Sequence, residues 1–227
     1  MLSALIKVLF ANKERRKRIK VISILQPENL HIYEARGISW GANQIWYKDA
    51  WQRKSGCGPT TCANLICYLA KTQKNLHGLW GQEINDKTNM LGLMEELWRY
   101  ITPTKGLGVN KTSIFAEGAA QFAKDKGRLL TPNILDIPPA VEKRPGQDKV
   151  RAFLSNAFSN NLPVAFLNLD NGKVKNLEYW HWVTLISLNE NQLTTYMVDQ
   201  GHKSEIDLEL WLSTTKGGGG FVVLEAV

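Results

Sequence analysis

The spacing of apolar residues changes near residue 160 of the chain. Before that point apolar residues recur every three or four positions, which is the pattern of helices that pack on a core by one face. This spacing predicts four helices, over residues 57–70, 90–100, 112–126 and 148–160. Residues 131–147 contain four prolines, and we expect this segment to be a loop.

After residue 160, short apolar runs alternate with turn residues, which is typical of strands. We expect strands over residues 163–168, 180–187, 193–198 and 221–224, and a short helix over residues 207–212. Because the helices come first and the strands follow, the pattern predicts an α+β fold. In this fold an N-terminal helical part packs on a C-terminal, mostly antiparallel β-sheet.

The first 36 residues differ in character from the rest of the chain. They contain an apolar start, a basic run over residues 13–18 and a short apolar segment over residues 21–25. Residues 37–56 are rich in Trp, Gly and Lys, and we expect them to be irregular. We therefore divide the chain into an N-terminal extension, 1–36, and one domain, 37–227, that is long enough to bury a substantial core.

The composition is that of an ordinary globular protein, with 44% hydrophobic and 22% charged residues. The net charge is +7; the basic run holds five basic residues and one acidic residue, so it contributes +4 and leaves +3 for the rest. Residues 13–20 could therefore make weak contact with an anionic surface, and no specific nucleic-acid binding is expected. The chain shows neither a secretory signal nor an apolar run of the roughly 20 residues that span a bilayer, so we expect a cytoplasmic protein.

The chain contains three cysteines, Cys57, Cys62 and Cys67. An odd number without a secretory signal argues against a disulfide framework and for a reducing compartment. Five-residue steps along a helix rotate each thiol by about 140° from the one before. The three thiols therefore point in different directions, and we expect neither a metal site nor another cofactor.

Cys57 is the candidate nucleophile because of its surroundings. It lies between Gly56 and Gly58 at the expected start of a helix. Unpaired amides at a helix N-terminus create a positive potential that stabilises a thiolate. Glycines on both sides keep side chains out of the path of an incoming carbonyl. A cysteine alone is more often a buried structural thiol, and this setting is what favours a nucleophile.

A thiolate nucleophile needs a partner that holds its proton and returns it to the leaving group. His181 lies in an apolar strand pattern and is the best candidate for this role. Asp199 ends the next apolar strand, and the short connection at residues 189–192 predicts a hairpin. The hairpin would bring Asp199 beside His181 as the acceptor that orients the imidazole. Gln200 and Asp136 are the alternatives for the orienting residue.

These segments, taken in order, resemble those of a known superfamily. They are Cys57-Gly58-Pro59 at a helix start, Leu162-Pro163-Val164 at a strand start, His181-Trp182-Val183 and Val198-Asp199. They are similar to the papain-like cysteine peptidases, and closest to the bacteriocin-leader-peptidase-like branch. The resemblance covers about residues 45–227. It implies a papain-like fold and a thiol hydrolase that cleaves a peptide or amide bond in a peptide or protein substrate. By this resemblance Cys57 would be the nucleophile, His181 the base and Asp199 the orienting residue.

The resemblance is imperfect at the oxyanion hole. The family has a glutamine six residues before the cysteine, where this chain has Trp51. Gln52 is the candidate for that role, with the Cys57 amide as the second donor. Two other functions stay open. Acyl transfer to an amine, as in transglutaminase-like enzymes, would use the same site, and a catalytically silent papain-fold binding module would account for the displaced glutamine. Trp51, Trp180 or Trp182 could wall a substrate cleft.

Overall fold

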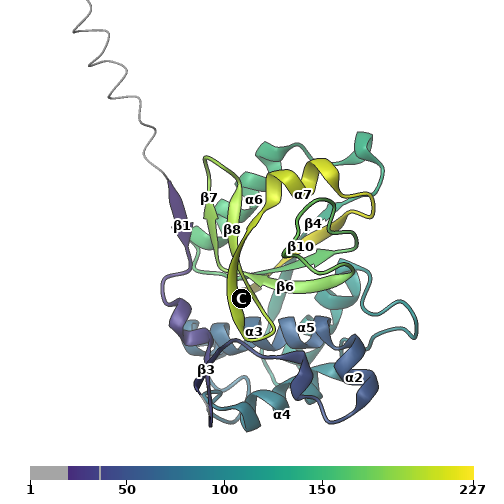
Figure 1. Cartoon of the computed structure of the whole chain (residues 1–227). Helices are drawn as coiled ribbons and strands as arrows, with labels where there is room; N and C mark the ends of the chain where they lie inside the picture. The colour runs from purple at the N-terminus through teal and green to yellow at the C-terminus, as the bar shows by residue number, and fades with distance from the viewer. Residues whose placement is uncertain (1–19, 36) are drawn as a thin grey trace, which may run out of the picture.

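The computed structural model describes residues 20–35 and 37–227. The basic run and the apolar start of the chain lie outside the described residues. In the described part, helices and an antiparallel sheet form an α+β fold (Figure 1), which confirms the predicted class.

The four predicted helices are all present, within three residues of their expected ends. The helices are α2 (Ala50–Ser55), α3 (Cys57–Thr72), α4 (Lys87–Trp98), α5 (Thr112–Asp125), α6 (Gln147–Ser159) and α7 (Leu208–Thr214). Short 3-10 turns are η1 (Pro27–Leu30), η2 (Gln44–Trp46), η3 (Lys74–Leu76) and η4 (Val141–Lys143). Aspartates begin three of the helices in the described part of the chain: the carboxylates of Asp49, Asp86 and Asp207 accept backbone N–H groups at the starts of α2, α4 and α7. The segment 37–56, expected to be irregular, thus contains a helix and a 3-10 turn.

Within residues 20–35 and 37–227 the sheet contains eight strands, and all of their pairings are antiparallel. Seven lie in the order β1-β7-β8-β6-β5-β10-β4, and β9 pairs with β8. The strands are β1 (Val21–Ser23), β4 (Leu130–Ile137), β5 (Val164–Asn168), β6 (His181–Leu185), β7 (Ser187–Asn189), β8 (Thr194–Asp199), β9 (His202–Asp207) and β10 (Gly219–Ala226). A separate two-stranded sheet joins β2 (His31–Glu34) to β3 (Gly37–Trp40). The expected hairpin is present, because β6 and β7 both pair with β8.

One expectation was wrong: residues 131–147 are not all loop. Their first part forms β4, which pairs with β10 over eight residues, from Leu130 opposite Ala226 to Ile137 opposite Gly219. The strand lies at the end of the strand order, so only one of its edges is paired. Proline is tolerated on such an edge strand because its missing N–H need not be on the paired side. Pro132 therefore does not interrupt the sheet.

The folded body also begins earlier in the chain than residue 37. Strand β1 pairs with β7, with Val21 opposite Asn189, and β2 pairs with β3. Residues 21–34 therefore supply strands to the fold. For residues 1–19 the assignment as an extension remains a prediction.

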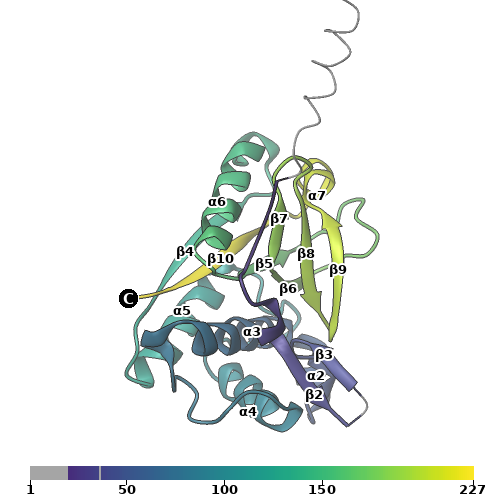
Figure 2. The same ribbon diagram turned by 90° about the vertical axis from the view of Figure 1, so that its left-hand side faces the viewer.

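Helix α3 lies at the centre of the molecule. Every residue from Gly58 to Leu69 is buried. This helix and α5 pack on one face of the sheet, while α6 and α7 pack on the other (Figures 1 and 2). On the second face the rings of Phe166 and Phe221 stack, and they meet Trp211 of α7 and Phe153 of α6. Across residues 20–35 and 37–227, none of the helices combines the length and apolarity that a membrane crossing requires.

Candidate functional site

The site begins at the junction between α2 and α3, where a single residue separates the two helices. That residue is Gly56, and a Cβ built on it would lie 2.5 Å from the ring of Tyr47 and 2.6 Å from the Gln52 carbonyl oxygen. A Cβ on Gly58 would lie 3.0 Å from Val109. Gly56 is thus required for the close packing at this junction, whereas a side chain at Gly58 would need Val109 to shift slightly. Cys57 lies between the two glycines, is half-buried and is the first residue of α3. Its thiol is therefore at the N-terminus, the positive end, of a 16-residue helix.

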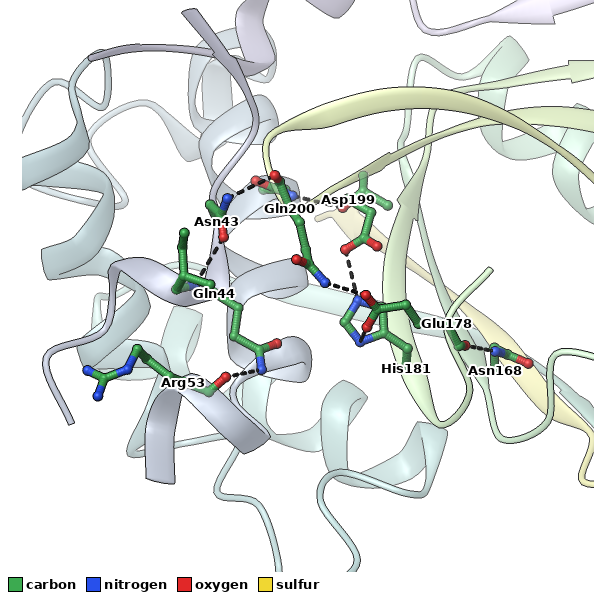
Figure 3. Close-up of polar contacts among 11 residues, drawn as sticks. Asn43, Gln44, Arg53, Asn168, Glu178, His181, Asp199 and Gln200 are labelled. Carbon is green, nitrogen blue, oxygen red and sulfur yellow. Dashed lines mark hydrogen bonds and ion pairs between the residues drawn. The ribbon is translucent and has the colours of Figure 1, made fainter. Parts of the chain in front are cut away.

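His181 and Asp199 lie together across the predicted hairpin. His181 is the first residue of β6, and Asp199 is the last residue of β8. Thr184 pairs with Val198, so Asp199 stands near the start of β6. The distance from His181 Nε2 to Asp199 Oδ1 is 2.8 Å (Figure 3). This contact fixes the imidazole ring and occupies one of its two nitrogens.

Cys57 is the second partner of His181. Burial is the strongest single influence on the imidazole and lowers its pKa, but hydrogen bonds to Asp199 and to the Cys57 thiol, together with the charges of both groups, raise the pKa of His181 well above its usual value. Since Nε2 faces Asp199, Nδ1 is the nitrogen left for the thiol. The structure therefore brings three of the four predicted site residues together.

A small cavity joins these three residues to their supports. Its lining comprises Ala42, Gln44, Cys57, Thr60, Thr61, Asn64, His181, Trp182, Val198, Asp199 and Gln200. Asn64 connects the elements that carry the two reactive groups. It lies two turns after Cys57 on α3, its Nδ2 donates to Thr184 Oγ1 of β6 at 3.1 Å, and its Oδ1 accepts the Ala42 N–H at 2.7 Å.

The turn after Asp199 is tied to the segment that leads into α2. The side-chain amide of Asn43 donates to the backbone oxygen of Gln200 at 2.8 Å (Figure 3). Nearby, the Trp40 N–H donates to the Gly201 carbonyl at 2.9 Å. Gln200 itself has a positive φ of 46°. These contacts hold a strained turn in place and thereby fix the end of β8 that carries Asp199.

Gln52, the predicted oxyanion donor, does not line the cavity. It lies in α2, where its backbone N–H donates to Asp49 Oδ1 at 3.0 Å. Gln44 lines the cavity beside Cys57 and His181. Its Nε2 donates to the Arg53 carbonyl at 2.6 Å (Figure 3), and its Oε1 is buried with no hydrogen-bond partner among the residues that the structure describes. The role of Gln52 stays a prediction, and Gln44 is a glutamine that lines the cavity with Cys57.

A second pocket of about 230 Å³ opens beside Cys57. Trp51, Leu107 and Trp180 contribute to its wall. Trp180 has a φ of 56°, and its indole N–H donates to the Leu107 carbonyl at 2.8 Å. Trp51 and Trp180, two of the tryptophans expected to wall a cleft, therefore lie next to the thiol. Trp182 is instead buried against Phe115 and reaches the small cavity.

The alternatives for the orienting residue have other partners. The carboxylate of Asp136 accepts the hydroxyl of Thr112 and lies outside the cavity. Gln200 lines the cavity, but its side-chain amide donates to Glu178 Oε1 at 2.8 Å. Within the described residues, no group of three or more His, Cys, Asp or Glu side chains is arranged to hold a metal ion.

Sequence reasoning missed Gln44, Asn64 and Glu178. Glu178 Oε2 lies 3.8 Å from His181 Nδ1 (Figure 3). In the sequence, the local sign that Glu178 could reach the site is its position three residues before His181. Gln44 and Asn64 reach the site through tertiary packing, and no spacing in the sequence marks them.

Comparisons with known proteins are sparse. No family model matches the chain, and no curated protein matches it. Among solved structures, the crystal structure of the Pseudomonas avirulence protein AvrPphB matches with 10% sequence identity and a TM-score of 0.32. The match covers 76% of this chain and 92% of that chain.

Proposed function

We propose that this chain is a papain-like thiol hydrolase that cleaves a peptide or amide bond in a peptide or protein substrate. The observation that carries the proposal is the position of His181. It lies between the Cys57 thiol, at the N-terminus of α3, and the Asp199 carboxylate. The distance from His181 Nε2 to Asp199 Oδ1 is 2.8 Å. The three side chains thus lie side by side as candidate nucleophile, proton carrier and orienting acceptor, which is the arrangement that acyl transfer through a covalent intermediate requires.

In this mechanism the Cys57 thiolate attacks the substrate carbonyl carbon. The His181 imidazolium, paired with the thiolate, supplies the proton for the leaving group. The proton moves from Nδ1 to the leaving nitrogen as the carbon–nitrogen bond breaks, which leaves an acyl-enzyme on the sulfur. The neutral imidazole then takes a proton from water, which attacks the acyl group and frees the thiol. Asp199 keeps Nε2 paired throughout and so holds the ring in the orientation that both steps need.

The oxyanion that forms during attack needs nearby donors. The Cys57 N–H is one candidate because the first amides of a helix have no intrahelical partner. Gln44 is the other candidate, because this residue lines the cavity with Cys57. One hydrogen of its Nε2 is given to the Arg53 carbonyl, and the second is available for a ligand. This assignment is proposed as an alternative to Gln52, whose role stays a prediction. It reduces the support for a silent binding module, which depended on the displaced glutamine.

The test is alkylation of Cys57 by iodoacetamide near pH 6. Comparison among the three cysteines would measure accessibility alone, because Cys62 and Cys67 are completely buried. The matched control is therefore Cys57 in the His181→Gln variant, where the thiol keeps its exposure but loses its partner. An ordinary thiol is only about 0.3% ionised at pH 6. We expect wild-type Cys57 to react at least about tenfold faster than in the variant, and equal rates would refute the proposal.

A further inference from the structure

A second carboxylate lies beside the imidazole of His181, on the side away from Asp199. Glu178 Oε2 is 3.8 Å from Nδ1, the nitrogen that faces the thiol. This distance is too long for a hydrogen bond but short enough for an ion pair. His181 therefore has a negative group near each ring nitrogen, Asp199 at Nε2 and Glu178 at Nδ1 (Figure 3).

The position of Glu178 is set by contacts at both ends of the residue. Gln200 Nε2 donates to Glu178 Oε1 at 2.8 Å. The Asn168 side-chain amide donates to the Glu178 backbone oxygen. Gln200 is in turn held through its own backbone oxygen by Asn43. The Glu178 side chain is 59% exposed, and these contacts keep its carboxylate on the imidazole side of the site (Figure 3).

The charges around the imidazole come from three elements. Within the described residues, the titratable groups in contact with His181 are Cys57 of α3, Asp199 of β8 and Glu178 of the segment before β6. Cys57 and Asp199 already belong to the proposed catalytic arrangement. Glu178 is left as a fixed negative charge that faces the proton-carrying nitrogen.

We propose that Glu178 is a positioning residue for the catalytic pair: its carboxylate, fixed by Gln200, favours the proton on His181 Nδ1. This inference rests on the proposed function, since the proton matters only if Cys57 and His181 react as a pair. A negative charge near an imidazolium stabilises the charged form. The proton still passes from Nδ1 to the leaving nitrogen, and Glu178 takes no part in the transfer. An exposed ion pair of this kind contributes modestly, so we expect a shift of about 0.2 to 0.7 in the pKa of His181.

The test is a titration of the His181 ring by NMR in protein labelled at histidine. The chain has four histidines, and the spectrum of His181→Gln assigns the resonance. Glu178→Gln removes the charge and keeps an oxygen that can accept from Gln200, so the fold around the site is retained. Gln200→Ala keeps the charge and removes the contact that fixes it. Glu117→Gln, on the exposed side of α5, is the control for loss of a carboxylate elsewhere.

At low salt we expect Glu178→Gln to lower the pKa of His181 by about 0.2 to 0.7 of a unit. Gln200→Ala should cause a smaller fall, Glu117→Gln should cause none, and high salt should reduce the effect of Glu178→Gln. A titration curve in Glu178→Gln that superimposes on wild type would overturn the inference, as would an equal fall in Glu117→Gln. Iodoacetamide labelling of the same samples separates the two proposals. Fast labelling of Cys57 with an unchanged titration rejects only the role of Glu178, whereas slow labelling in wild type rejects the hydrolase itself.

Discussion

Asn64 and Thr184 are hydrogen-bonded across the interface between α3 and β6, with 3.1 Å between Asn64 Nδ2 and Thr184 Oγ1. Both side chains are buried. Asn64 follows Cys57 by two helical turns, and Thr184 follows His181 by three residues. The side-chain oxygen of Asn64 also accepts a hydrogen bond from the backbone N–H of Ala42, two residues before Gln44. One side chain therefore joins the three segments that supply the thiol, the imidazole and the cavity-lining amide.

Substitution of Asn64 should be severe for a single polar residue. Asn64→Ala leaves the Ala42 N–H and the Thr184 hydroxyl buried without their partner, and we expect a loss of about 2–4 kcal/mol in the free energy of unfolding. Thr184→Val removes one contact and should lose about 1–2 kcal/mol. Urea denaturation of both variants measures these losses in the free energy of unfolding. If Asn64→Ala were no less stable than Thr184→Val, the linking role of Asn64 would be wrong.

The junction before the thiol should not accept a side chain. Gly56→Ala places a Cβ 2.5 Å from the Tyr47 ring, which is itself buried, so the ring or the helix must shift. Overpacking of this kind destabilises by about 1–3 kcal/mol. Gly81→Ala is the matched control, because nothing lies within 4 Å of a Cβ there and its φ is not positive. Thermal unfolding should separate the two variants clearly, and equal melting temperatures would contradict the packing described for the junction.

The fold could be predicted from sequence where the signal was local. Helices α3, α5 and α6 have apolar residues at helical spacing, and the β6–β8 hairpin has a short connection between apolar runs. Strand β4 was missed because its prolines indicate a loop unless the strand is known to lie at a sheet edge. Strand β1 was missed because it is three residues long and its partner β7 is far away in the chain.

The same distinction applies to the site. The contact between His181 and Asp199 could be predicted because a hairpin brings the ends of neighbouring strands together. The contact between His181 and Cys57 was inferred from chemistry, since 124 positions separate them in the sequence. The approach of Gln44 depends on how the segment before α2 packs against α3 and the end of β8. No periodicity describes that packing, so the sequence alone points to the nearer glutamine, Gln52, whose role stays a prediction.

The protonated imidazole should make stability depend on pH. The pKa of His181 in the folded protein lies well above its value of about 6.5 in an unfolded chain. Protonation therefore favours the folded state. The contribution is fully present below about pH 6.5 and is lost as the pH rises through the folded-state pKa. The free energy of unfolding of wild type, minus that of His181→Gln, should be largest near pH 6 and should fall at higher pH. Chemical denaturation of both proteins at pH 6 and above measures this difference in the free energy of unfolding. A difference that grows as the pH rises would contradict the raised pKa of His181.

Two glutamines near Cys57 should differ in their effect on acylation. Removal of one oxyanion donor typically lowers the rate about 10²- to 10³-fold. We expect Gln44→Ala to slow formation of the acyl-enzyme from an activated ester such as p-nitrophenyl acetate by that amount. Gln52→Ala should change the rate by less than about threefold, because Gln52 is not among the residues that line the cavity with Cys57 and His181. A large loss in Gln52→Ala with Gln44→Ala unaffected would restore the original assignment.

Loss of Asp199 should weaken the pair without changing access to the thiol. Hydrogen bonds to charged groups contribute about 1.5–3 kcal/mol. We therefore expect Asp199→Ala to slow alkylation of Cys57 near pH 6 by about 10- to 100-fold. Asp136→Ala is the matched control, because Asp136 contacts Thr112 outside the cavity and should leave the rate unchanged. Reversed effects of the two variants would assign the orienting role to Asp136.

The most direct measurement is the ultraviolet absorbance of the thiolate, followed against pH as the difference between wild type and Cys57→Ser. If the sulfur and the imidazole of His181 form an ionised pair, excess absorbance is already present near pH 6 and is lost in His181→Gln at the same pH. Absorbance that develops only above about pH 8 in both proteins, as for an ordinary thiol, would contradict the account.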